Sequence, residues 1–175
     1  LDPMSFVRSR IGGVLLIFNF TEDKHGFDGR VDIVISGDEN EDIYLSKVEL
    51  APKNQGQHLC KLMVTYCLQR AYQIIRQGNE ELGLSSLTLD KKQNLTGDVY
   101  VSTITKHFTA AKKCYISSFE KIGFVLTAEF GIEYLPDEEN AEIISQVLQF
   151  TEVDKTADQV NAQLQSQLLV PEFGY

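Results

Sequence analysis

Short hydrophobic runs dominate the first third of the chain, and in residues 30–35 hydrophobic positions 31, 33 and 35 alternate with the others. Short runs rich in β-branched and aromatic residues, separated by polar loops, are typical of strands and too short for helices. Three strands are predicted, over residues 14–20, 30–35 and 43–51. The third must end at Pro52, because proline cannot continue a hydrogen-bonded ladder. The loop between the first two strands predicts a hairpin, and the three strands together predict an antiparallel meander.

After Pro52 the hydrophobic residues recur at intervals of three and four, which is the spacing of an amphipathic helix. This helix is predicted to reach about Arg76 and to stop at Gly78. A strand over residues 82–90 follows, and a connection of that length favours parallel pairing with the strand before the helix. The next segment, Lys91 to Lys106, combines turn signals with the strand-like run VYVSTIT, for which the sequence offers no clear partner.

The last third of the chain again contains helical and strand-like stretches. A hydrophobic stripe over residues 108–122 predicts a second helix that ends at Gly123, and FVLTAEF predicts a strand after it. Pro136 and the acidic residues behind it predict the start of a third helix, and Asp154 is expected to cap a last one. The buried side of the third helix would consist of Ile143, Ile144, Val147 and Leu148.

The order of these elements predicts an α+β fold with a mixed, mostly antiparallel sheet flanked by helices. We expect one compact unit, because 175 residues are enough for one hydrophobic core and few for two. Its main part is expected over residues 4–135, with a C-terminal helical extension over residues 136–175 packed on the same domain. Leu1–Pro3 look like a cloning remnant before the native start at Met4, so the part before Gly12 is short.

Charge and cysteine content exclude several classes of function. The formal net charge of −9 disfavours a nucleic-acid partner, because it would repel a phosphate backbone. No apolar run approaches the roughly 20 residues that a membrane helix needs, so no membrane partner is expected. Cys60, Cys67 and Cys114 are odd in number and follow no secretory leader, which predicts free thiols and a cytoplasmic location. Their spacing and that of the histidines predict no metal site.

Two short motifs, set in this order of elements, carry a resemblance to a known family. The stretch PKNQGQHLCKLM, residues 52–63, follows the third strand, and FEKIGF, residues 119–124, ends the second helix. Together with the spacing of the elements between Gly13 and Phe130, they resemble the GNAT superfamily of acyl-CoA-dependent N-acyltransferases. The resemblance implies a GNAT-like fold with a short N-terminal part and extra C-terminal helices, and acetyl-CoA or coenzyme A as the cofactor.

The turn after the third strand is where the resemblance places the cofactor. Family members read Pro-x-x-Arg/Gln-Gly-x-Gly-x-Gly/Ala, and backbone N–H groups at the helix N-terminus hold the pyrophosphate, because the helix dipole attracts anions. Pro52, Gln55 and Gly56 match this pattern. His58 and Cys60 replace its second and third small residues, and a histidine could obstruct the pyrophosphate or donate a ring N–H to it. The implied cofactor-binding residues are Val48, Leu50, Gln55, Gly56, Gln57, His58, Leu59 and Cys60.

The resemblance also implies a general acid and a base. The family's tyrosine acid stands four residues before Gly-Phe, where this chain has Phe119. Tyr115, one turn earlier on the same helical face, or its neighbour Cys114 could replace it. Glu49 is the candidate base, because an amine attacks a thioester only when neutral, and the backbone N–H of about Leu50 is the candidate oxyanion donor. The structural alternatives are a core aromatic for Tyr115 and a solvated strand residue for Glu49.

Three functions remain open from the sequence. The first is an N-acyltransferase in which an amine-bearing acceptor, a small molecule or a protein, attacks the thioester directly. The second is a catalytically impaired acyl-CoA-binding or protein-interaction module, because Phe119, His58 and Cys60 all depart from the family pattern toward lost function. The third is an unrelated α+β interaction domain. The acidic charge favours a cationic acceptor such as a polyamine or a lysine-rich tail, and the oligomeric state stays open.

Overall fold

The computed structural model describes residues 1–8, 13–35, 41–56, 58–83, 94–136 and 142–153. Within these residues the chain forms seven strands, three α-helices and one 3-10 turn. In chain order they are β1 (Met4–Arg8), β2 (Val14–Phe20), α1 (Glu22–His25), β3 (Gly29–Ile35), β4 (Ile43–Leu50), the 3-10 turn Pro52–Asn54, α2 (Leu59–Gln77), β5 (Thr96–Ile104), α3 (Thr105–Lys121), β6 (Phe124–Pro136) and β7 (Glu142–Glu152).

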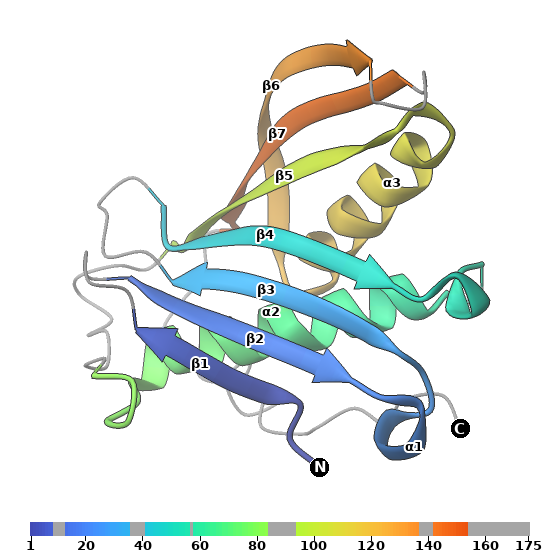
Figure 1. The fold of residues 1–175 in the computed structure, drawn as a ribbon. Helices are drawn as coiled ribbons and strands as arrows, with labels where there is room; N and C mark the ends of the chain where they lie inside the picture. The colour runs from blue at the N-terminus through green and yellow to red at the C-terminus, as the bar shows by residue number, and fades with distance from the viewer. Residues whose placement is uncertain (9–12, 36–40, 57, 84–93, 137–141, 154–175) are drawn as a thin grey trace.

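All seven strands belong to one sheet, in the order β1-β2-β3-β4-β5-β7-β6 (Figure 1). Strands β1 to β4 form an antiparallel meander, and β7 pairs antiparallel with both β5 and β6. Strand β5 runs parallel to β4, because the long helix α2 lies between them in the chain and carries it back across the sheet. The predicted mixed, mostly antiparallel sheet is therefore confirmed, as is the hairpin of β2 and β3.

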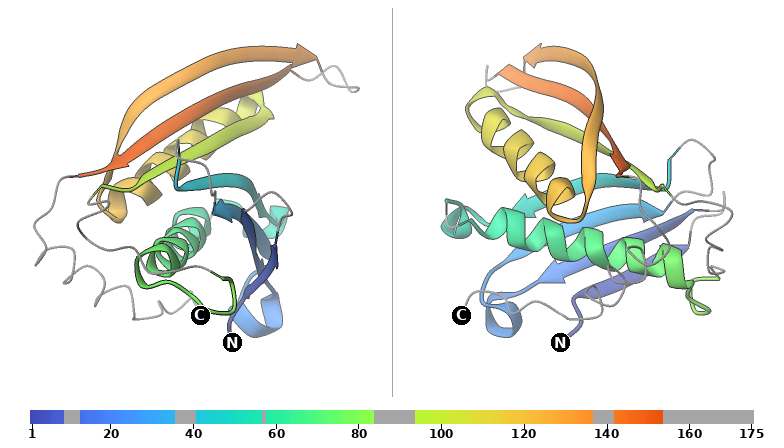
Figure 2. Two further views of the ribbon diagram at one scale, coloured as in Figure 1. Left: turned by 90° about the vertical axis from the view of Figure 1, so that its left-hand side faces the viewer. Right: turned by 180° about the vertical axis from the view of Figure 1, so that it is seen from behind.

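Both long helices lie on the same face of the sheet (Figure 2). Helix α2 crosses the half formed by β1 to β4, and α3 packs against the half formed by β5, β6 and β7. Buried aromatic rings fill the space between helices and sheet: Phe119 and Phe150 stack with ring centres 4.0 Å apart, and Tyr72 and Phe124 lie 4.6 Å apart. None of the described helices is long and apolar enough to cross a bilayer.

The two long helices end at the glycines that the sequence singles out. Gly78 has a φ of 76° and donates its N–H to the Ile74 carbonyl at 2.8 Å. Gly123 has a φ of 91° and donates its N–H to the Glu120 carbonyl at 3.1 Å. Glycine adopts this left-handed backbone without a steric penalty, so both helix ends are confirmed where the sequence predicts them.

The predicted helix after Pro136 is wrong over most of its length. Residues 142–152 form strand β7, which lies inside the sheet between β5 and β6. Ile144 and Leu148 are buried, and their four-residue spacing fits the two-residue period of a strand as well as a helix. The segment forms a strand and not a helix because its backbone makes hydrogen bonds to β5 on one side and to β6 on the other. The helix predicted from Asp154 lies outside the described residues.

The sheet also contains strands that the hydrophobic pattern does not predict. Strand β1 is an edge strand with mostly exposed residues, so no alternation of burial marks it in the sequence. The parallel partner of β4 is β5, from the segment 91–106 for which the sequence offers no partner. It buries Gly97, Val99 and Val101 in alternation. The strand expected over residues 82–90 lies largely outside the described part of the chain.

Strands β4 and β5 separate after only three paired positions. The pairs are Ile43 with Gly97, Tyr44 with Asp98 and Leu45 with Val99. Strand β4 continues to Leu50 and β5 to Ile104, and Figure 1 shows the two strands diverging beyond the paired end. The register between β3 and β4 shifts between Asp32 and Ile33, which leaves Ser46 as the extra residue of a β-bulge. The bulge bends β4 at the residue where it leaves β5, and we call the resulting gap the β4–β5 opening.

Gly97 stands at the closed end of this opening and leaves room for the core beneath it. A Cβ atom at this position would meet the Tyr72 hydroxyl and would lie 2.8 Å from Cε1 of Phe119. Both rings are fully buried, so neither can move aside. We therefore expect Gly97→Ala to lower the free energy of unfolding by about 1–3 kcal/mol, the usual cost of overpacking, in urea denaturation. An unchanged urea midpoint would contradict this packing.

Candidate active site

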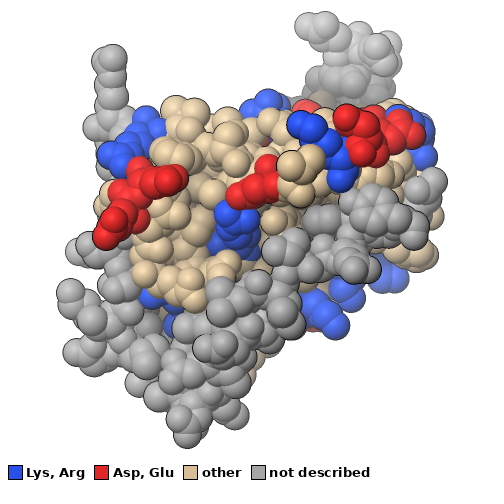
Figure 3. Space-filling model, turned by 90° about the horizontal axis from the view of Figure 1, so that it is seen from below, with Lys and Arg blue, Asp and Glu red and all other residues tan. Residues whose placement is uncertain are grey.

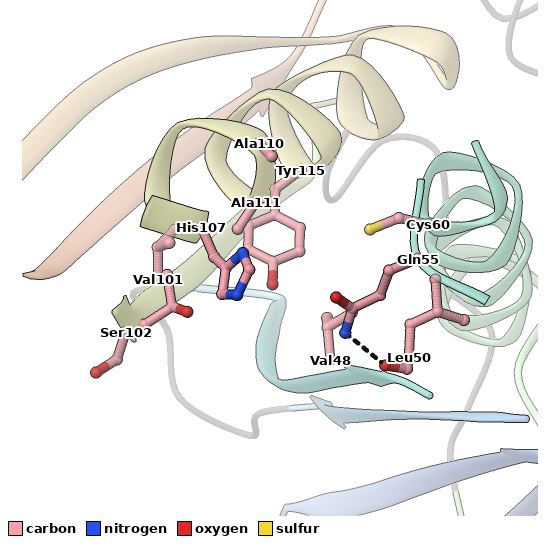
Figure 4. A pocket seen from close by; sticks show the side chains of 11 residues that line it. Val48, Leu50, Gln55, Cys60, Val101, Ser102, His107, Ala110, Ala111 and Tyr115 are labelled. Carbon is pink, nitrogen blue, oxygen red and sulfur yellow. Dashed lines mark hydrogen bonds between the residues drawn. The ribbon is translucent and has the colours of Figure 1, made fainter. Parts of the chain in front are cut away.

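A cavity of about 260 Å³ lies where β4 and β5 diverge. Strands β4 and β5 and the N-terminal part of α3 form its walls, and Gln55 and Cys60 contribute to the lining. Its lining consists of Val48, Leu50, Gln55, Cys60, Val101, Ser102, Thr103, His107, Ala110, Ala111 and Tyr115 (Figure 4). A mostly apolar wall with a few polar groups is typical of sites for small organic ligands.

Five residues selected from the sequence meet in this cavity: Val48, Leu50, Gln55, Cys60 and Tyr115. Val48 and Leu50 both face it from β4, because alternate residues of a strand share one face. Nε2 of Gln55 donates a hydrogen bond to the Leu50 carbonyl oxygen at 3.0 Å, which is the dashed line in Figure 4. This bond holds the start of the turn against the end of β4.

The other predicted cofactor residues that the structure describes lie in the turn before α2 and at the start of that helix, and they do not line the cavity. Gly56 and His58 are exposed and have left-handed φ angles of 78° and 60°. His58 thus has the backbone conformation that glycine favours, and its side chain is exposed. Helix α2 begins at Leu59 without a side-chain cap from any described residue, so its first N–H groups are candidates for binding an anion. Gln57 lies outside the described residues.

Ion pairs anchor this turn to helix α1. Lys53 pairs with Glu22 and, at 2.9 Å, with Asp28; hydrogen bonds to Glu22 and then Asp28 raise the pKa of Lys53 to about 12. The Asp28 backbone N–H also donates to Oδ1 of Asn54 at 3.1 Å. Elsewhere, acidic and basic side chains lie interspersed on the described part of the face in Figure 3. The net charge of −9 is therefore not gathered into one acidic patch on that part of the surface.

Tyr115 points its hydroxyl into the cavity (Figure 4). Its side chain is buried, and this burial raises the pKa of Tyr115 to about 12. The hydroxyl makes no hydrogen bond to any residue that the structure describes, so it is available to a ligand. Phe119, which stands where the family pattern has its tyrosine, is fully buried and stacked on Phe150. Helix α3 therefore presents residue 115, and not residue 119, to the cavity.

Glu49 lies on the face of β4 opposite the cavity. Its neighbours Val48 and Leu50 line the cavity, whereas its own side chain is 62% exposed. The Glu49 carboxylate lies 3.5 Å from Nζ of Lys47, so the predicted shared face of these two residues is confirmed. Glu49 is thus placed on the open side of the sheet, where it can act on the cavity only across the β4–β5 opening.

His107 lines the same cavity, and the sequence reasoning did not select it. His107, Ala111 and Tyr115 are spaced by four residues along α3, which places them on one helical face. Figure 4 shows the imidazole and the Tyr115 ring projecting from that face into the cavity. This four-residue spacing could have predicted His107 from the sequence, because His107 lies two helical turns before Tyr115.

Cys60 and Cys114 form a disulfide that ties the first turn of α2 to α3. The prediction of three free thiols is therefore wrong for these two, and Cys114 has no proton to donate as an acid. Cys67 is a free thiol in the core, where burial raises its pKa. The two bonded cysteines are 54 residues apart in sequence, but α2 and α3 pack side by side and bring their Cα atoms to 6.2 Å. The expectation of a cytoplasmic location rested on three free thiols, and the disulfide removes that support.

The disulfide is expected to stabilise the fold by restricting the unfolded chain. For a separation of 54 residues, the chain-entropy relation gives about 4 kcal/mol, and measured losses for native disulfides are about 2–5 kcal/mol. Urea denaturation with and without a dithiol reductant should show a loss in this range. The double variant Cys60→Ser with Cys114→Ser should show the same loss and no further response to reductant.

The control for this measurement is Cys67→Ser, which leaves the bridge intact. This variant should keep the full response to reductant, whatever its own stability. Equal stability of the wild-type chain in both conditions would contradict a stabilising bridge.

Solved structures that resemble this chain include two acetyltransferases. One is described as a candidate acetyltransferase of the GNAT family from Desulfovibrio desulfuricans, with 16% identity, a TM-score of 0.41, and 77% of this chain and 68% of that chain covered. The other is the Bacillus subtilis acetyltransferase in complex with CoA, with 11% identity, a TM-score of 0.41, and 82% and 78% covered. No family model matches the chain, and no curated protein matches it significantly. At these values the likeness assigns no ligand or reaction.

Proposed function

We propose that this chain is an acyl-CoA-dependent N-acyltransferase that takes acetyl-CoA and transfers its acyl group directly to an amine. The observation that carries this proposal is the β4–β5 opening. Two parallel strands pair at three positions and then diverge beside an apolar cavity, whose lining reaches the first turn of α2 at Cys60. A fully paired sheet would leave no passage between the cavity on the helix side and an acceptor on the other side.

The lining of the cavity suits the long, mostly apolar arm of an acyl-CoA. Val48, Leu50 and Val101 supply apolar walls. Beyond their last paired residues, β4 and β5 make no backbone hydrogen bonds to each other, so the N–H and C=O groups on their facing edges are available to the amides of the arm. The N-terminus of α2 would hold the pyrophosphate through its first N–H groups and its dipole. Bound acetyl-CoA supplies an acyl group already activated as a thioester.

Tyr115 is the proposed hydrogen-bond donor to the leaving sulfur. With a pKa of about 12, its hydroxyl keeps its proton at neutral pH. An aliphatic thiol has a reference pKa of about 8.5, so complete proton transfer from Tyr115 to a thiolate would cost about 5 kcal/mol. We therefore assign to Tyr115 a hydrogen bond that stabilises negative charge on the sulfur. The thiolate is neutralised by a second proton, which the amine nitrogen loses after it has added to the thioester carbonyl and as the C–S bond breaks.

Two side chains are placed to receive the proton of the amine. Glu49 lies on the open face of β4, from which an amine would approach, and could act through a water molecule. His107 lines the cavity and could act from within it. We assign the base to Glu49, because the amine must lose its proton on the acceptor side, before it attacks the thioester.

Cofactor binding is tested by thermal unfolding of the pure protein with acetyl-CoA. A ligand that binds only the folded state stabilises it by about 2.7 kcal/mol at 100 times its Kd, so the midpoint should rise. Ala111→Trp, which fills the cavity from α3, should abolish the rise. Thr109→Trp is the matched control, because residue 109 is exposed and does not line this cavity, and it should keep the rise.

Catalysis is tested by release of free thiol from acetyl-CoA with a panel of amines. Tyr115→Phe removes only the hydroxyl, so kcat should fall about 10- to 100-fold while the KM for acetyl-CoA stays nearly constant. Glu49→Gln should lower kcat about 100-fold, and His107→Gln by less than tenfold. A larger loss of kcat in His107→Gln than in Glu49→Gln would instead assign the role of general base to His107.

A second function is favoured by one observation, the burial of Phe119 where the family pattern has its acid. A chain that has lost this acid could bind acyl-CoA without turning it over, as a sensing or interaction module. This alternative predicts the rise in thermal midpoint with acetyl-CoA, and its loss in Ala111→Trp, but no thiol release with any amine.

A further inference from the structure

The sheet face opposite the cavity carries two tyrosines and a carboxylate at the closed end of the β4–β5 opening. Tyr44 of β4 pairs in register with Asp98 of β5, so their side chains are neighbours on one face. Tyr100 lies two residues further along β5 on the same face and is 41% exposed. Tyr44 and Asp98 are half-buried. We call these three residues the outer patch.

The carboxylate of the outer patch has no cationic partner in the described part of the chain. Oδ2 of Asp98 accepts a hydrogen bond from Nε2 of Gln149 at 3.3 Å, and this partner is neutral. Burial raises the pKa of Tyr44, and electrostatic interactions with Tyr100, Glu41 and Asp98 add to the effect, which places the Glu41 carboxylate close to the patch as well. The patch therefore offers aromatic faces and negative potential together.

Two cations on this face of the meander, Lys47 and Arg30, are already paired. Lys47 lies 3.5 Å from Glu49, and Arg30 lies 2.8 Å from Asp32. Their charges are locally offset, so they do not cancel the negative potential at Asp98. An ammonium group that approaches along this face would meet the outer patch at the closed end of the opening.

We propose that the outer patch binds a second positive charge of the acceptor, which makes the acceptor a linear diamine or polyamine. This inference rests on the proposed acyltransferase function and names its acceptor class. Tyrosine rings attract an ammonium through their π faces, and a carboxylate adds Coulomb attraction. Tyr44 and Val48 pair with Val34 and Val31 of β3, which lie three residues apart, or about 10 Å along a strand. The bound charge and the reacting amine must therefore be separated by a chain of comparable length.

The test compares two acceptors that differ only in the distal charge, 1,8-diaminooctane and 8-amino-1-octanol. We expect kcat/KM for the diamine to exceed that for the amino alcohol by about tenfold or more. Tyr100→Ala and Asp98→Asn should each raise the KM for the diamine by about two- to fivefold, the range of an exposed cation–π or charge contact. Neither change should alter the KM for the amino alcohol, and Tyr100→Phe should retain most of the preference because it keeps the ring.

Matched controls and a binding measurement separate the outcomes. Phe6→Ala removes a partly exposed ring from the far edge strand, and Asp23→Asn removes an exposed carboxylate from α1; both should keep the preference for the diamine. Calorimetric titration of the diamine into the protein with CoA should show weaker binding in Tyr100→Ala. Equal kcat/KM for the two acceptors would overturn the outer patch and leave the acyltransferase standing. No rise in thermal midpoint with acetyl-CoA would overturn the proposed function and this inference with it.

Discussion

The separation of β4 from β5 after three paired residues is the constraint on which the rest of the site depends. Backbone groups in a sheet interior need hydrogen-bond partners, so a sheet that opens in its middle must satisfy them by other means. The bulge at Ser46 bends β4 away, and Gly97 lets the closed end pack directly on Tyr72 and Phe119. The same opening creates the cavity on the helix side and borders the outer patch on the other side.

The walls of the cavity are held in place by a disulfide and by ion pairs. The disulfide between Cys60 and Cys114 fixes the first turn of α2 against α3, and Lys53 ties the preceding turn to α1. His58 adopts a left-handed backbone conformation, which is less stable by about 1 kcal/mol or more for any residue except glycine. The surrounding contacts hold the chain in this conformation. A site built in this way can hold its shape before a ligand arrives, which lowers the entropic cost of binding.

The features that could be predicted from the sequence are those whose signals are local. Strand β2 is a short β-branched and aromatic run, β3 shows alternation, and α2 and α3 show a stripe and an end at glycine. The turn carries a short motif, and its Gln55 and Cys60 line one cavity with Val48 and Leu50. The features that failed depend on partners distant in the chain. Strand β7 forms because it pairs with β5 on one side and with β6 on the other. The disulfide forms because the packing of α2 against α3 brings together two cysteines that are 54 residues apart in sequence.

The central claim, that an acyl-CoA enters the β4–β5 opening with its pyrophosphate at the start of α2, is tested most directly by NMR. Coenzyme A would be titrated into ¹⁵N-labelled protein while the backbone amide signals are followed. The account predicts saturable shifts at Leu59 to Leu62 and along the diverging parts of β4 and β5, with little change at β1. Shifts that do not saturate, or that fall outside these segments, would contradict it.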